Sequence, residues 1–89
     1  MVRRDKAIKA LIESLPEHSE AIERAYLESA QFGSMCSDFQ MCFNALAHWN
    51  ETASSDAPIH RREYEDLLHE IKQEILGWLD ARGYLKPTD

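Results

Sequence analysis

The sequence predicts an all-α protein, on its composition and on the spacing of its apolar residues. The chain has 89 residues with only three Gly and three Pro, and no run of Val, Ile and Thr alternates with polar residues as a strand would. Two long segments instead repeat apolar residues at steps of four and three, the spacing of helices that pack lengthwise. We expect one helical domain over 1–89, an antiparallel helical hairpin with an N-terminal helical segment. It would form a small three-helix or dimeric bundle.

The N-terminal helical segment is expected over 3–28. Its first part places four apolar residues at helical spacing, Ile8, Leu11, Ile12 and Leu15. Pro16 interrupts this pattern, so the segment is either two helices or one helix kinked at Pro16. Ser14 is a candidate cap for a second helix, because Pro is tolerated in a first turn. The second part should bury Ile22, Ala25 and Tyr26.

The central helix is expected over 30–51, with Ser29 as its N-cap. Gly33 indicates either a bend at this end or a close-packing contact. One apolar stripe, the seam, is predicted to face the partner helix: Phe32, Cys36, Phe39, Phe43 and Leu46. A second stripe, Met35, Cys42 and Trp49, widens the apolar face beyond what one partner helix covers. We predict these three as interface residues, packed on the N-terminal segment or on another protein.

A loop is expected over 52–58, where small polar residues precede Pro58 and Asp56 is a candidate cap. The last helix is expected over 59–82 and repeats the seam spacing with Tyr64, Leu68, Ile71, Ile75, Trp78 and Arg82, while Leu67, Leu76 and Leu79 widen its face. Gly83 suits the position just after the helix, followed by a tail over 83–89. Antiparallel pairing places Trp49 near the loop and Trp78 near the opposite end of the hairpin.

Charge is spread unevenly along the chain. The net charge is −6; the first ten residues contribute about +3, from Arg3, Arg4, Lys6 and Lys9 against Asp5, so the remainder carries about −9. An acidic surface repels phosphate backbones, so we do not expect nucleic-acid binding. No apolar run approaches the ~20 residues of a membrane span, and no signal-peptide core follows Met1. We therefore expect a cytoplasmic protein with no membrane partner.

The residues that carry chemistry do not form a recognisable site. Cys36 and Cys42 are six residues apart, which on a helix is a rise of about 9 Å and exceeds the ~7 Å limit of a disulfide. Their spacing also fails the short Cys pairs of zinc sites. We expect both to be small apolar core residues, with intermolecular disulfide formation or a redox response as the alternative. The four His are scattered, so we predict no catalytic residue, metal, cofactor or small-molecule substrate.

The segments PEHSEAIERAYLESAQFGSMCSDF and YEDLLHEIKQEIL carry a resemblance to a known family. Together with the loop between them they resemble the YdcH-type family of short bacterial helical proteins, across residues 16–82. The matching positions are Pro16, Glu17 and His18 at the opening, Ile22, Phe32, Asp38 and Phe39, then Leu67, Leu68, Ile71 and Ile75. Central Leu and Ile positions of the family are replaced here by Cys36, Cys42 and Trp49. The resemblance implies a bacterial helical hairpin that self-associates, and it brings no catalytic residues.

These observations predict a small non-enzymatic interaction or oligomerisation module. Its expected partner is a second copy of itself, as a dimer or higher coiled-coil oligomer, or another helical protein. Trp49 is the first candidate contact, because Trp is common among interface anchors. The alternative is a redox-responsive regulator that acts through Cys36 or Cys42. A metal-dependent enzyme is a third hypothesis, for which no ligand set is visible.

Overall fold

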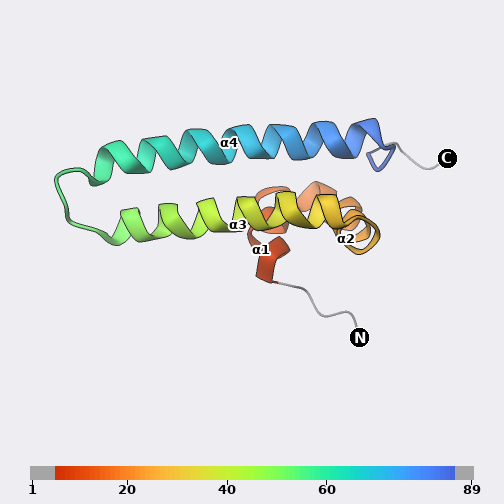
Figure 1. Cartoon of the computed structure of the whole chain (residues 1–89), viewed down its shortest axis with the longest axis horizontal. Helices are drawn as coiled ribbons and strands as arrows, with labels where there is room; N and C mark the ends of the chain where they lie inside the picture. The colour runs from red at the N-terminus through yellow and green to blue at the C-terminus, as the bar shows by residue number, and fades with distance from the viewer. Residues whose placement is uncertain (1–5, 86–89) are drawn as a thin grey trace.

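A computed structural model describes residues 6–85, with side chains from residue 8 onward (Figure 1). The chain forms, in order, α1 (Lys6–Ser14), the 3₁₀ turn η1 (Pro16–His18), α2 (Ser19–Glu28), α3 (Ala30–Glu51) and α4 (Ala57–Ala81). No strand occurs within 6–85, and the all-α prediction is confirmed. The basic residues Arg3 and Arg4 and the end of the tail, 86–89, lie outside the described residues.

The two long helices α3 and α4 form an antiparallel hairpin that spans the longest dimension of the molecule (Figure 1). The molecule measures 52 × 28 × 21 Å along its principal axes. Trp49 packs on His60 near the loop and Phe32 packs on Trp78 at the opposite end, so the two helices are in contact at both ends. Helices α1 and α2 lie against only one half of this hairpin (Figure 1).

Pro16 separates two helices rather than kinking one. Helix α1 ends at Ser14, and Leu15 has φ −131° and ψ 61°, outside the helical region. This fits the restriction that a proline imposes on the residue before it. Ser14 does not cap the helical turn after Leu15, because η1 has Leu15 at its N-cap and no side-chain hydrogen bond there. Both α1 and α2 can therefore pack on α3 at their own angles.

The junction between α2 and α3 is a single extended residue, Ser29, with φ −138° and ψ 120°. Its hydroxyl accepts a hydrogen bond from the Phe32 amide at 3.2 Å, which confirms the predicted N-cap. Gly33 lies inside α3 and faces the Tyr26 ring, where an added Cβ would meet the ring at 3.7 Å. The chain thus turns at Ser29, and Gly33 is a packing position.

Helix α4 begins at Ala57, two residues before the sequence prediction placed it. Pro58 does not end the loop but lies in the first helical turn, where its missing N–H needs no partner. Asp56 makes no side-chain cap; its backbone carbonyl instead accepts from the amides of Ile59 and His60. The loop is therefore shorter than expected.

Gly83 ends α4 as the sequence predicts. It has φ +82°, a conformation that costs glycine little and other residues more. The Tyr84 amide bonds the Leu79 carbonyl and the Gly83 amide bonds the Asp80 carbonyl, which is the Schellman pattern. The carbonyls at the helix end are thereby satisfied and the chain reverses toward α2.

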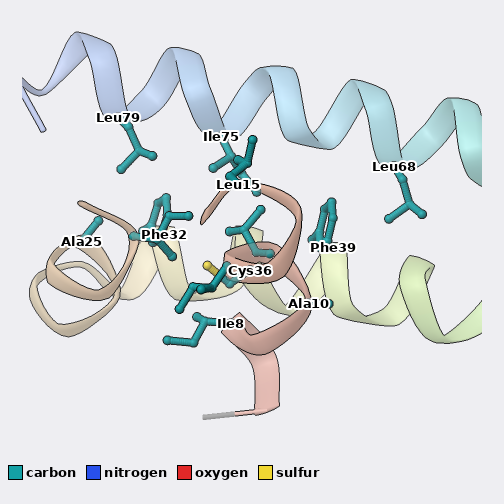
Figure 2. Packing of buried hydrophobic residues seen from close by; sticks show 13 residues of the cluster. Ile8, Ala10, Leu15, Ala25, Phe32, Cys36, Phe39, Leu68, Ile75 and Leu79 are labelled. Carbon is teal, nitrogen blue, oxygen red and sulfur yellow. The ribbon is translucent and has the colours of Figure 1, made fainter. Parts of the chain in front are cut away.

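The core lies where α1 and α2 meet the hairpin (Figure 2). Helix α3 contributes Phe32, Cys36 and Phe39, each at most 1% exposed. The remaining members of the cluster come from the other three helices and from Leu15, which lies between α1 and η1: Ile8, Ala10, Leu11, Ile12, Leu15, Ile22, Ala25, Leu68, Ile75 and Leu79. The predicted apolar face of residues 8–15 is therefore confirmed as core.

The seam does not stay buried along its whole length, which corrects the sequence prediction. Phe43, expected in the core, is 39% exposed, and Leu67 is 38% exposed. Arg82 is also exposed at the end of α4 and places its guanidinium over the Trp78 ring, 4.5 Å from the centroid. The reason lies in the tertiary structure. A seam residue is buried only where α1 or α2 covers the groove between α3 and α4.

Candidate functional site

The hairpin divides into two halves of different burial. We call the half that α1 and α2 cover the proximal half, and the other the distal half: α3 over 40–51, the loop, and α4 over 57–67. Helix α1 borders the distal half only at its edge, beside Gln40, Phe43 and Asn44. Between Phe39 and Leu68, Ala57 is the one buried apolar residue. Four large apolar side chains of the distal half are exposed: Met41 69%, Ile59 63%, Phe43 39% and Leu67 38%. The distal half therefore exposes several large apolar side chains that no third helix covers.

The distal part of α3 also lacks charge. Residues 39–50 contain no Asp, Glu, Lys or Arg, the longest such run in a chain that is 29% charged. The facing part of α4 includes Arg61, Arg62 and Glu63 within one turn. A helix surface in water normally carries charged residues opposite its buried stripe. The exposed side of distal α3 therefore lacks the charged side chains of an ordinary solvent-facing helix surface and resembles a helix face that packs on another helix.

The predicted interface residues lie along the side of α3 that adjoins α4. Met35 and Cys42 are partly buried and pack against the core. Trp49 stacks on His60 with ring centroids 4.3 Å apart and an interplanar angle of 25°. The His60 Nδ1 in turn lies 2.9 Å from a Glu63 carboxylate oxygen. Each of the three predicted residues retains a partly exposed surface, so their role as contacts stays a prediction.

A groove beside Phe43 marks where α1 stops covering α3. It holds about 460 Å³ and is lined by Lys9, Ala10 and Glu13 of α1 and by Gln40, Phe43 and Asn44 of α3. The sequence prediction missed this groove because it assigned Phe43 to the buried seam. The signal that would have revealed it is the charge-free run, since a helix buried on one side only should show charges on the other.

A second hollow, of about 500 Å³, lies between α2 and α3. Its lining is small and polar: Tyr26, Ser29, Ala30, Gly33, Ser34, Ser37 and Asp38. Asp38 is exposed. The hydroxyls have no buried base or nucleophile beside them in this lining, so the hollow offers binding polarity without a catalytic arrangement.

The base of the hairpin is closed by stacked rings and cations. Trp78 packs against Phe32 at 4.9 Å and stacks on Tyr84 at 5.8 Å between centroids. Arg24 lies over the Tyr84 ring, whose hydroxyl donates a hydrogen bond to Glu28. This bond favours the neutral phenol, so it raises the pKa of Tyr84. Trp78 therefore packs against the core and connects α4 to α2 through Tyr84.

The two thiols are protected to different degrees. Cys36 is fully buried, and its burial raises the pKa from 9.0 to about 12. Cys42 is partly exposed; burial, and then the Asp38 carboxylate, raise its pKa. Both shifts lower the fraction of reactive thiolate at neutral pH. The two thiols are not joined by a disulfide.

We searched the described residues for metal sites and membrane spans, and compared the chain with known proteins. Within 8–85, no group of three or more His, Cys, Asp or Glu side chains is arranged to hold a metal ion. None of the helices that the structure describes combines the length and the apolarity needed to span a bilayer. No protein-family model, curated protein or solved structure matches this chain.

Proposed function

We propose that this protein is a small non-enzymatic interaction module whose contact surface is the distal half of the hairpin. The observation that carries the proposal is the charge-free stretch of α3 over 39–50, within which the large apolar side chain of Phe43 is exposed. Exposed apolar surface that a fold leaves without cover is typical of sites that bind another protein. The partner surface is helical and apolar, because it must fill the side of a helix pair.

The proximal half supplies the rigidity that such a module needs. Its core joins all four α-helices, and the ring cluster at Trp78 ties the end of α4 to α2. A hairpin held at one end presents its other end in a defined shape, which lowers the entropy lost on binding. The resemblance to the YdcH-type family implies a helical hairpin that self-associates, in agreement with this proposal.

The test is comparative affinity capture from cells that express an untagged copy of the chain. Trp49→Ala should reduce the amount of captured protein while leaving the melting temperature nearly unchanged, because Trp49 is a partly exposed residue of the proposed surface. Leu27→Ala is the matched control, since Leu27 is 71% exposed but lies on α2, outside the distal half. Equal capture by the wild type and both variants would refute the proposal.

The redox alternative receives less support from the geometry. A redox-sensing thiol needs thiolate character and access. Cys36 has neither, and Cys42 has partial access with a raised pKa. We therefore propose both thiols as packing residues.

A further inference from the structure

We infer that the occupant of the distal half is a second copy of this chain, docked antiparallel on the face of α3 that contains Phe43. The inference rests on the proposed function and adds the partner and the contact face. Phe43, Ala47 and Asn50 share one face of α3 through their spacing of four and three. All three are exposed, and Phe43 adjoins the groove at the edge of α1.

This face continues a surface that the fold already uses. Near Gln40 and Asn44 the side of α3 faces Lys9, Ala10 and Glu13 of α1. Beyond that point α3 runs beside α4 alone, with no further helix below it (Figure 1). A helix from another molecule can therefore occupy the position that α1 occupies in the proximal half.

Charge favours a second copy over other occupants. The chain carries −6, so two copies repel wherever their acidic faces meet. Residues 39–50 form the longest stretch of the chain without charged side chains, so two copies that meet there bring no like charges together. Nucleic acids and anionic membranes are negative and would be repelled by the same body. A strongly basic partner would gain more from the acidic parts of the molecule than from a neutral face.

Symmetry sets the orientation. A closed dimer uses the same patch on both copies, related by a two-fold axis. An axis perpendicular to α3 pairs the uncovered part of the charge-free run, residues 43–50, with itself, antiparallel, over about 12 Å. It also puts the thick ends formed by α1 and α2 at opposite ends of the dimer, whereas a parallel pair would press them together. One helix face is less than the ~800 Å² per partner of a standard interface, so we expect a micromolar dissociation constant.

The experiment is absolute mass in solution, by light scattering or sedimentation, from about 1 μM to about 500 μM chain. The wild type should move from monomer to dimer, and Phe43→Glu should weaken dimerisation at least about tenfold, because it places two carboxylates in the contact. Met41→Glu is the matched control. Met41 is more exposed than Phe43, at 69%, and lies about 200° away around the helix. This variant should dimerise like the wild type.

Circular dichroism checks that each variant is folded, and Ala47→Glu replaces Phe43→Glu if the latter unfolds. Equal weakening by Met41→Glu and Phe43→Glu, or no weakening by either, would overturn the choice of face. A wild type that stays monomeric at every concentration would overturn the second copy as occupant. In that case the proposed function is retained only if capture of a different protein depends on Trp49. Failure of the dimer inference can therefore be distinguished from failure of the proposed function.

Discussion

The proximal and distal halves of the hairpin use the same helices and the same apolar spacing, yet only one of them is a core. Phe39 is 1% exposed and Phe43, one turn further along α3, is 39% exposed. Neither local helix propensity nor the four-three pattern differs between them. The difference is the third layer: α1 and α2 cover the part of the hairpin that contains Phe39, and Phe43 lies at the open edge of that cover. A helical pair by itself buries too little surface to make a core.

The largest effect expected from this comparison is on stability. Phe39→Ala should lower the free energy of unfolding by about 3–5 kcal/mol, because it leaves a cavity in a closed core. Phe43→Ala should cost about 1 kcal/mol or less in the monomer, because its side chain already contacts water. Chemical denaturation at low protein concentration measures both. Similar losses for the two variants would mean that the halves are packed alike.

Hydrogen exchange should show the same contrast without mutation. Backbone amides of α3 in the distal half should exchange at least about tenfold faster than those near Cys36, because opening there exposes fewer buried contacts. Native-state exchange at micromolar chain concentration, read residue by residue, measures the ratio. Raising the concentration should slow only the distal amides if copies associate. Uniform protection along α3 at all concentrations would contradict the comparison.

The smallest expected effect is a pH dependence that distinguishes the two thiols. Cys36 has a pKa of about 12 in the folded chain against 9.0 for an exposed thiol. Above pH 9 the unfolded chain loses this proton first, so stability is complete below pH 9 and falls as the pH rises toward 12. At pH 10 the loss should be about 1 kcal/mol. Cys36 lies in the proximal half and Cys42 in the distal half.

Unfolding free energies at pH 8 and pH 10 test this difference. Cys36→Ala should remove most of the decrease in unfolding free energy between pH 8 and pH 10 that the other titrating groups do not cause. Cys42→Ala is the control and should retain most of it, because Cys42 is less buried than Cys36. A fall that disappears in Cys42→Ala and persists in Cys36→Ala would reverse the assignment.

The sequence predicted much of the local structure, because local structure is encoded by neighbouring residues. Ser29 caps α3 and Gly83 ends α4 as expected, since each depends on one residue's hydrogen bonding or backbone freedom. The start of α4 was missed because a proline is compatible both with a loop and with a first helical turn. The candidate surface was found only in part, since Trp49 was named and Phe43 was placed in the core.

By itself, the sequence determined an all-α chain, the Ser29 cap of α3, the Gly83 end of α4 and a hairpin whose two helices carry matching apolar stripes. It also contained the charge-free run over 39–50. The tertiary structure decided how far along that hairpin α1 and α2 reach, and therefore which of two equivalent phenylalanines is core and which is surface. Burial depends on residues distant in the chain, so periodicity can place a side chain on a face but cannot say whether anything covers it.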